Sequence, residues 1–234
     1  MFVKMIKAII FDLDNTLIDF MTMKRMAVSG AIRAMQDAGL SISKTKAEKV
    51  MYELYDKHGM EYQKVFQDFL KQVLGKVDYK ILAHAIVGYR KIERGFMQPY
   101  PKVKSTLRQL DKKGIRLTIL TDAPRMRAWL RLAELELSDY FEIVLTYEDT
   151  KVKKPSKKAF EKMLKKLKLK PEEVLMVGDS LDKDIAGANA VGMKTCYAKY
   201  GDLEKSDKKI KADYSINNIG ELLNFIEKWR GTYN

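Results

Sequence analysis

The stretch Ile6-Lys7-Ala8-Ile9-Ile10-Phe11-Asp12-Leu13-Asp14-Asn15-Thr16 decides the fold of this chain. Residues 6–11 form an apolar run, rich in β-branched residues, that is typical of a strand buried at the centre of a parallel sheet. Asp12 and Asp14 follow where such a strand opens into a loop, and open α/β sheets bind their ligands there. Two neighbouring carboxylates repel each other, so a cation or a shared proton is expected beside them. A polar turn in which Asp14 or Asn15 caps a helix explains this fragment equally well.

The composition indicates a folded globular protein. The 234 residues suffice for one large core, or for a core domain with a smaller second domain. Apolar residues make up 46% of the chain and charged residues 32%, which argues against disorder. The single cysteine, Cys196, excludes an internal disulfide framework. The apolar run near the N-terminus breaks at Asp12, and no run is long enough to span a bilayer, so we expect a cytoplasmic protein without a membrane partner.

The net charge of +13 is concentrated in one segment, because residues 151–170 contain ten lysines and a single acid, Glu161. Such a segment is either a polyanion-binding face or the solvated face of an amphipathic helix. Apolar residues recur among the lysines at helical spacing, namely Phe160, Met163, Leu164 and Leu167. This spacing favours the solvated face, and no nucleic-acid partner is expected.

After Thr16 the apolar pattern changes from the period of a strand to the period of a helix. It predicts four consecutive helices, and glycines near three of their ends support the boundaries. The predicted helices span about 20–39, 44–57, 61–74 and 78–93. The sequence therefore predicts an all-helical insert after the first strand.

From Pro99 onward, short apolar runs alternate with amphipathic segments. The runs predict strands at residues 116–120, 141–145, 174–177, 194–198 and 214–216. The amphipathic segments predict helices that begin near residues 101, 124, 156, 183 and 219. Repeated strand–helix units indicate an α/β fold with a parallel sheet and right-handed crossovers.

Acidic residues follow several of these strands at the point where the apolar run ends. Asp12 and Asp14 follow the first strand, Asp122 follows the strand at 116–120, and Asp179 follows the strand at 174–177. The carboxyl ends of parallel strands meet at one edge of the sheet, so these groups converge there. Carboxylate oxygens suit Mg²⁺. The chain lacks the glycine-rich phosphate-binding and dinucleotide-binding segments and the Gly-x-Ser-x-Gly elbow, which argues against those chemistries.

In these residues the chain resembles the haloacid dehalogenase (HAD) superfamily of hydrolases. Its first motif, Asp-x-Asp-x-Thr, matches Asp12-Leu13-Asp14-Asn15-Thr16 in full. The second, a strand ending in Ser or Thr, matches Thr121. The third, a lysine often followed by proline, matches Lys154-Pro155. The fourth, Gly-Asp with a second acid a few residues on, matches Gly178-Asp179 and Asp184. The motifs occur in the family's order, and the resemblance covers the whole chain.

The resemblance implies a Rossmann-like core with helices on both faces of the sheet, formed by residues 1–18 and 99–234. It also implies that residues 19–98 form an α-helical cap domain, which can close over the site and select the leaving group. By the same resemblance, Asp12 is the nucleophile and forms a phosphoaspartate intermediate. Asp14 protonates the leaving oxygen, later activates water, and ligates Mg²⁺ through its backbone carbonyl.

The resemblance also implies roles for residues later in the chain. Thr121 and Lys154 would hold phosphoryl oxygens. Asp179 would be a metal ligand together with Asp12, and Asp184 would orient the metal shell. Asp182 is a second candidate for this last role, but the spacing of Asp184 fits the family better.

One residue departs from the family pattern. Asp122 stands where many relatives carry Asn, and its negative charge would repel an anionic substrate. We expect Asp122 to be the N-cap of the helix that contains Pro124.

These expectations combine into a Mg²⁺-dependent phosphatase that acts on small phosphorylated metabolites, with phosphoglycolate-like or glyceraldehyde-3-phosphate-like substrates possible by resemblance. Asp14 separates this function from dehalogenation, because a halide leaves without a proton. A phosphosugar mutase of the same superfamily is an alternative, and a basic polyanion-binding protein is a second one. The sequence does not indicate an oligomeric state.

Overall fold

The computed structural model describes residues 5–203 and 209–229 of the chain. Two compact units are present. Met1–Asp19 and Pro99–Asn234 form the first, which we call the sheet unit, and Phe20–Gln98 form the second, which we call the helical unit. The ends of the predicted core domain, residues 1–4 and 230–234, lie outside the described residues.

The sheet unit contains a six-stranded parallel sheet with the strand order β3-β2-β1-β4-β5-β6. The strands are β1 (Ala8–Phe11), β2 (Arg116–Leu120), β3 (Ile143–Leu145), β4 (Val174–Gly178), β5 (Lys194–Ala198) and β6 (Tyr214–Ile216). The α/β fold with a parallel sheet, predicted from the sequence, is confirmed.

β1 lies in the middle of the sheet, between β2 and β4, and all four of its residues are buried. Phe11 is in register with Ile119 on β2 and with Val177 on β4. The residues that follow these three strands therefore meet at the same edge of the sheet, as their parallel direction requires.

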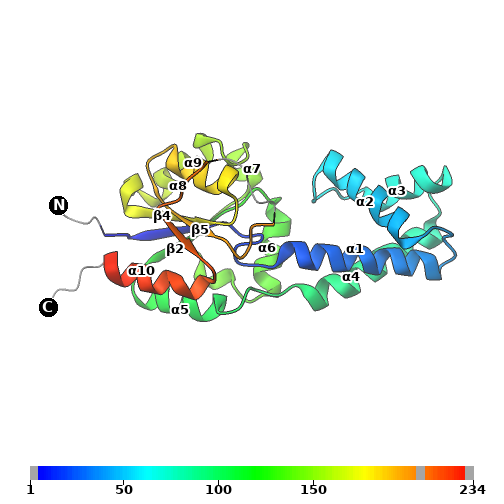
Figure 1. The fold of residues 1–234 in the computed structure, drawn as a ribbon, viewed down its shortest axis with the longest axis horizontal. Helices are drawn as coiled ribbons and strands as arrows, with labels where there is room; N and C mark the ends of the chain where they lie inside the picture. Colours follow the sequence, from blue (N-terminus) through cyan, green and yellow to red (C-terminus); the bar gives the residue numbers. More distant parts are fainter. Residues whose placement is uncertain (1–4, 204–208, 230–234) are drawn as a thin grey trace. The chain divides into compact units, whose positions relative to one another are not determined.

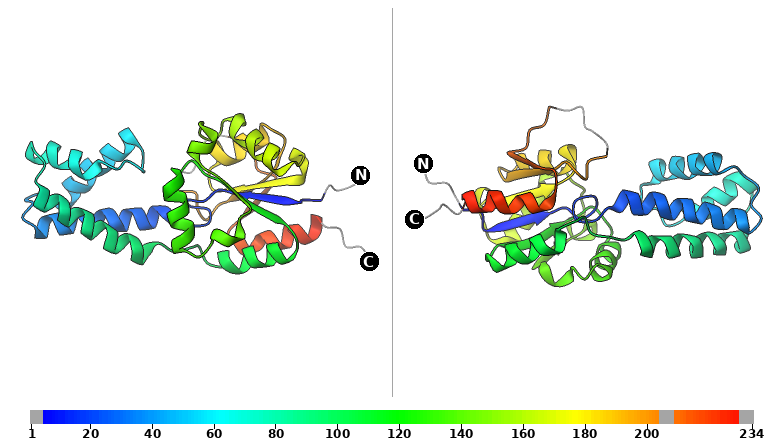
Figure 2. Two further views of the ribbon diagram at one scale, coloured as in Figure 1. Left: turned by 180° about the vertical axis from the view of Figure 1, so that it is seen from behind. Right: turned by 60° about the horizontal axis from the view of Figure 1, so that its bottom comes forward.

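Helices cover both faces of the sheet (Figure 1). α5 (Val103–Lys112) and α10 (Leu222–Trp229) lie on one face, and α8 (Lys157–Leu167) and α9 (Ala186–Asn189) on the other, as Figure 2 shows from two further directions. α6 (Arg125–Glu134) connects β2 to β3. Short helical turns complete the unit: η1 (Ser138–Tyr140), α7 (Tyr147–Thr150), η2 (Pro171–Glu173), η3 (Leu181–Ile185) and η4 (Ile219–Glu221).

α8 carries the lysine-rich segment, and its two faces differ as the periodicity predicts. Phe160, Met163 and Leu167 are buried in one core cluster with Ile10 of β1 and Met176 of β4. The lysines of α8 at positions 157, 158, 162, 165 and 166 are exposed. The apolar stripe thus attaches the helix to the sheet, and the lysines form its solvated face.

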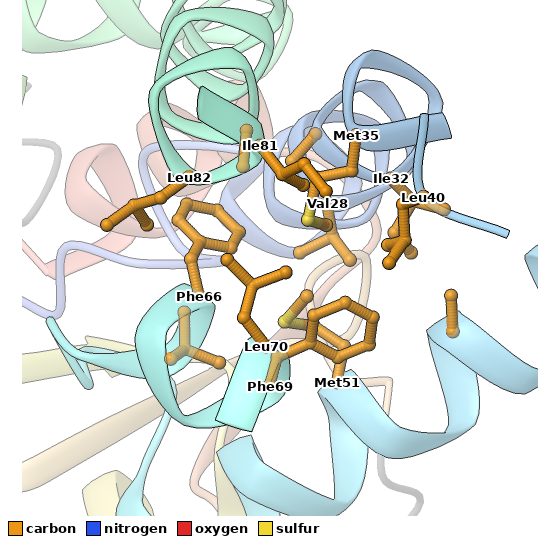
Figure 3. Close-up of a cluster of buried hydrophobic side chains, with 14 of the residues drawn as sticks. Val28, Ile32, Met35, Leu40, Met51, Phe66, Phe69, Leu70, Ile81 and Leu82 are labelled. Carbon is orange, nitrogen blue, oxygen red and sulfur yellow. The ribbon is translucent and has the colours of Figure 1, made fainter. Parts of the chain in front are cut away.

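The helical unit consists of four helices: α1 (Phe20–Asp37), α2 (Lys44–His58), α3 (Val65–Leu74) and α4 (Tyr79–Phe96). Its core is a cluster of buried side chains that includes Val28, Met35, Met51, Phe69 and Leu70 (Figure 3). None of the helices within the described residues combines the length and the apolar character that crossing a membrane demands.

α1 and α4 approach each other closely where two glycines face each other. A Cβ atom on Gly88 would lie 2.6 Å from the Cβ of Ala34 and 2.9 Å from the carbonyl oxygen of Gly30. Only a residue without a side chain fits at this crossing.

The chain leaves and re-enters the sheet unit at two neighbouring points. Ile18 forms an antiparallel bridge with Pro99, and the amide of Tyr100 donates to the carbonyl oxygen of Leu17 at 3.0 Å. The segments that lead into and out of the helical unit are thus joined by backbone hydrogen bonds.

Several element boundaries differ from the predicted ones. α3 begins at Val65 rather than near 61, and α5 begins at Val103 because Lys102 adopts a left-handed conformation with φ of 70°. The helix predicted from about 183 is a π-helical turn, η3, followed by the short α9. α7, a single turn closed by Thr146 and Asp149, lies outside the helices predicted from the sequence.

Candidate active site

The site begins at Asp12, the first residue after β1. Its amide donates to the carbonyl oxygen of Val177 at 2.9 Å, which extends the ladder to β4 by one bond. The side chain is buried, and its Oδ1 atom lies 2.5 Å from the Nζ atom of Lys154. A residue from the first motif and a residue from the third, 142 positions apart, therefore form a buried ion pair.

Among the residues that the structure describes, three carboxylates gather at one point: Asp12, Asp179 and Asp184 each offer an oxygen within 4.8 Å of the others. Lys154 also contacts Asp184, with Nζ 2.6 Å from Oδ1. Asp184, rather than the alternative Asp182, is thus the second acid of the fourth motif that joins the cluster. Carboxylate oxygens at this spacing are the donor set that a hard divalent cation prefers.

Gly178 makes room for Asp184. A Cβ atom at position 178 would lie 2.3 Å from the Cγ of Asp184, so any other residue would push this carboxylate away. The π-helical turn η3 brings Asp184 back toward the end of β4, and the amide of Ser180 donates to its Oδ2 atom at 3.1 Å. Functional sites often use such π-helical turns to reposition a side chain.

The cluster is electrostatically unbalanced. Burial raises the pKa of Asp179 to about 9, and the charges of Asp12 and Asp184 add to this effect. Burial also raises the pKa of Asp184 to about 6, although Lys154 opposes the rise. Burial lowers the pKa of Lys154, but the surrounding carboxylates outweigh it and hold the pKa above its ordinary value. A bound cation would relieve the repulsion that these shifts reflect.

Thr16 joins the first motif to the fourth. Its hydroxyl donates to Oδ1 of Asp179 at 2.9 Å and accepts a hydrogen bond from the amide of the same residue at 3.0 Å. The hydroxyl of Tyr200 in turn donates to the carbonyl oxygen of Thr16 at 2.8 Å. The loop from Asp12 to Thr16 is therefore held from two later parts of the chain.

Gly201, which follows Tyr200 in the chain, packs against the loop from Asp12 to Thr16. Asn15 has a left-handed backbone with φ of 61°, and its carbonyl oxygen would lie 1.7 Å from a Cβ atom on Gly201. A glycine at 201 is therefore required for the loop to keep this path.

Asp14 lies apart from the carboxylate cluster and has a cation of its own. Its Oδ2 atom is 2.7 Å from the NH1 atom of Arg131, and the side chain of Arg131 is 6% exposed. Arg131 is not among the site residues predicted from the sequence. One signal was present, because Ala128 and Leu132 make this face of α6 apolar and a charged residue on such a face needs a buried partner.

Thr121 follows β2, the strand beside β1, and is buried. Its amide donates to the carbonyl oxygen of Leu145 at 3.0 Å, and its hydroxyl accepts from the amide of Ala123 at 3.1 Å. These bonds place it at the same edge of the sheet as Asp12.

The prediction that Asp122 caps α6 is wrong. Pro124 occupies the N-cap position, and the amide of Arg125 is bound instead by Glu148 at 2.8 Å. Asp122 accepts a hydrogen bond from the backbone amide of Lys154 at 3.0 Å. The acid thus orients the loop that carries Lys154, a contact that local sequence rules for capping do not reveal.

The chain is similar in sequence to a known family of hydrolases and to enzymes of that family. Residues 6–192 match the family model for haloacid dehalogenase-like hydrolases. The glyceraldehyde 3-phosphate phosphatase of Methanocaldococcus jannaschii is 36% identical over 95% of this chain and 98% of its own length. The enzyme of the same name from Pyrococcus furiosus is 35% identical over 97% of this chain and 95% of its own length.

A solved structure, that of a HAD phosphatase from Thermococcus onnurineus, is similar as well. It is 27% identical in sequence and superposes with a TM-score of 0.64. The match covers 94% of this chain and 98% of that protein. The similarity to these proteins, in sequence and in fold, therefore extends over nearly the whole chain.

Proposed function

The chain belongs to the haloacid dehalogenase-like hydrolases and is a phosphatase, and from the site described above we propose that it hydrolyses small phosphate monoesters through a phosphoaspartate formed on Asp12. The observation that carries this proposal is the buried pair of Asp12 and Lys154 at the edge of the carboxylate cluster. Because two relatives are named glyceraldehyde 3-phosphate phosphatase, a phosphorylated three-carbon aldehyde is the first substrate to test.

Asp12 is the nucleophile. One of its carboxylate oxygens forms a bond to phosphorus while the bond between phosphorus and the ester oxygen breaks, with the electron pair leaving on that oxygen. Lys154 contacts the other oxygen of Asp12, and its positive charge offsets the repulsion between this carboxylate and an anionic substrate. Water then attacks the phosphoaspartate, releases inorganic phosphate and restores Asp12.

Asp14 is the acid and base of the two steps. It gives a proton to the leaving ester oxygen and takes a proton from the attacking water, so it ends each cycle unchanged. Its position outside the carboxylate cluster supports this role, because the two acids of the first motif then experience different surroundings.

Thr121 and Lys154 hold phosphoryl oxygens. The Thr121 hydroxyl lies at the end of the strand next to β1, and the Lys154 ammonium is within contact of Asp12. Positioning and charge stabilisation of this kind supply most of the catalysis in phosphoryl transfer.

The donor set fits Mg²⁺. Asp12, Asp179 and the backbone carbonyl of Asp14 would ligate it, and Asp184 would complete or orient its shell. When bound, Mg²⁺ neutralises charge between the nucleophile and the substrate phosphate.

We assign the helical unit, residues 20–98, as a cap domain that selects the leaving group. Its position in the chain, between the first and second motifs, supports this assignment, as does its separate core. The natural partner of the protein is then a small phosphorylated metabolite.

The test compares Asp12→Asn with Asp111→Asn, a matched control on the exposed face of α5. Release of phosphate from glyceraldehyde 3-phosphate and from p-nitrophenyl phosphate is measured with Mg²⁺ and with a chelator. Asp12→Asn should lose roughly 10³-fold or more of the turnover, as expected for a catalytic nucleophile, and the control should lose none. Wild-type turnover in Asp12→Asn would contradict the proposal.

A further inference from the structure

Arg131 is a buried arginine whose function the chemistry above leaves open. The residue is 5% exposed, and its guanidinium contacts Asp14 at 2.7 Å. Its neighbours on the same face of α6, Ala128 and Leu132, are fully buried. A charged group in such surroundings is costly unless it is paired, and the ion pair with Asp14 supplies such a pairing.

The two acids of the first motif each have a separate cation. Lys154 contacts Asp12 and Asp184, whereas Arg131 contacts Asp14. An aspartate side chain has several rotamers available, and Asp14 is only two residues from the nearest member of the carboxylate cluster. The ion pair with Arg131 restricts it to an orientation outside that cluster.

Arg131 can impose this restriction because the start of α6 is itself anchored. The amide of Arg125 donates to Oε2 of Glu148 at 2.8 Å, and the guanidinium of the same residue lies 2.7 Å from Oδ1 of Asp149. Both acids follow β3, so the helix that carries Arg131 is tied to the sheet at its N-terminal end.

We propose that Arg131 is a positioning residue for the reaction and that it acts only through Asp14, by holding the carboxyl group in the orientation from which its protonated form donates a proton to the leaving group. This inference rests on the proposed role of Asp14 as the general acid. Arg131 itself neither forms nor breaks a bond: the proton moves from Asp14 to the ester oxygen as the bond between that oxygen and phosphorus breaks.

The proposal predicts a dependence on the leaving group. An alkoxide leaves poorly without a proton, whereas p-nitrophenolate is a stable anion at neutral pH and leaves without one. Loss of Arg131 should therefore reduce kcat/KM strongly for an alkyl phosphate and weakly for p-nitrophenyl phosphate. The ratio kcat/KM covers the steps up to departure of the leaving group, so the hydrolysis of the phosphoaspartate, common to both substrates, does not affect it.

The experiment measures kcat and KM for glyceraldehyde 3-phosphate and for p-nitrophenyl phosphate in Arg131→Met, Arg131→Lys and Asp14→Asn. Arg108→Met, on the exposed face of α5, is the matched control. Arg131→Met should lose about 10²-fold in kcat/KM for the alkyl ester, the size of a general-acid contribution, and only a few-fold for the aryl ester. Arg131→Lys should recover part of the loss, because it keeps the charge.

A double variant, Asp14→Asn with Arg131→Met, is the second measurement. It removes the ion pair as a whole and leaves no buried charge behind, so it remains informative if Arg131→Met alone does not fold. If Arg131 acts only through Asp14, the double variant has the same kcat/KM as Asp14→Asn. A further loss in the double variant overturns the proposal.

The remaining outcomes separate the inference from the function on which it rests. Equal losses for both substrates in a folded Arg131→Met, combined with a leaving-group dependence in Asp14→Asn, overturn the role of Arg131 alone. If Asp14→Asn also loses equally on both substrates, the assignment of Asp14 as the acid is wrong, and the role of Arg131 is overturned with it.

Discussion

The carboxylate of Asp122 lies 3.0 Å from the backbone amide of Lys154 and accepts its hydrogen bond. The side chain of the same lysine contacts Asp12 and Asp184. Lys154 is therefore held at both ends, by its amide and by its ammonium. An aspartate at 122 is compatible with an anionic substrate because its carboxylate binds the backbone amide of the loop that carries Lys154.

The first prediction concerns this hydrogen bond. Asp122→Ala leaves the Lys154 amide without its acceptor, so we expect it to lose about 1–2 kcal/mol of stability. Because Lys154 contacts Asp12, the proposed nucleophile, kcat/KM should also fall by about 10-fold. Asp122→Asn keeps an acceptor oxygen and should retain activity within a few-fold. Urea unfolding and steady-state kinetics measure both effects, and equal losses in the two variants would show that charge, not the hydrogen bond, matters.

A second prediction follows from the space at Gly178. Gly178→Ala places a methyl group where Asp184 now lies, so overpacking should cost about 1–3 kcal/mol and displace a carboxylate of the cluster. Gly95→Ala is the control, because a Cβ atom at position 95 would meet no described atom within 4 Å and alanine is favoured in a helix. Thermal unfolding should show a loss for the first variant and no loss for the second. A Gly178→Ala protein with wild-type stability and activity would refute this account of the site.

The third prediction uses the crowded carboxylates. Burial beside two other carboxylates raises the pKa of Asp179 to about 9, so keeping this acid in the folded state costs stability at neutral pH. The uncharged Asp179→Asn should therefore make the metal-free protein more stable, while activity is lost. Wild-type protein should gain about 2.7 kcal/mol when Mg²⁺ is present at a hundred times its Kd, and Asp179→Asn should gain much less. Unfolding with Mg²⁺ and with a chelator tests this, with Asp111→Asn as the control. An undiminished response in Asp179→Asn would rule out this residue as a ligand.

A fourth prediction concerns pH and a site remote from catalysis. Asp213, just before β6, accepts from the amide of Thr195 at 2.9 Å, and its Oδ1 atom lies 2.9 Å from Nζ of Lys194. Partial burial raises the pKa of Asp213, but the hydrogen bonds from Lys194 and Thr195 outweigh it and hold the pKa below its ordinary value. The ionised form is therefore favoured by folding.

The stabilisation from Asp213 is present above the pKa of the unfolded chain, about 3.9, and is lost as the pH falls through the lower pKa of the folded state. At pH 7 the wild-type Tm should exceed that of Asp213→Asn. The difference should shrink below about pH 4. Scanning calorimetry across this range measures it, and a difference that is independent of pH would contradict the ionic origin.

The strands and the carboxylate cluster were accessible from the sequence because each depends on local pattern plus one topological rule. Apolar runs mark β1, β2 and β4, and parallel strands bring their following residues to one edge. Motif matching supplied Lys154 and Asp184, which no periodicity distinguishes from other charged residues.

The parts that sequence reasoning missed are contacts between distant residues. Arg131 meets Asp14 across 117 positions, and nothing near either residue identifies the partner. Asp122 precedes a helix and fits the local rule for a cap, yet its hydrogen bond goes to Lys154, 32 positions away. A local rule states what a side chain is able to do, and the tertiary fold decides between the alternatives.

The bridge between Ile18 and Pro99 has an evolutionary consequence. Because the two connections to the helical unit are joined by hydrogen bonds within the sheet unit, the distance between them is fixed whatever is inserted there. Any independently folding segment with adjacent termini could be exchanged at this point without disturbing β1 or the residues that follow it. On the proposed role of the helical unit in selecting the leaving group, this architecture allows substrate preference to diversify by recombination while the residues after β1 are inherited unchanged.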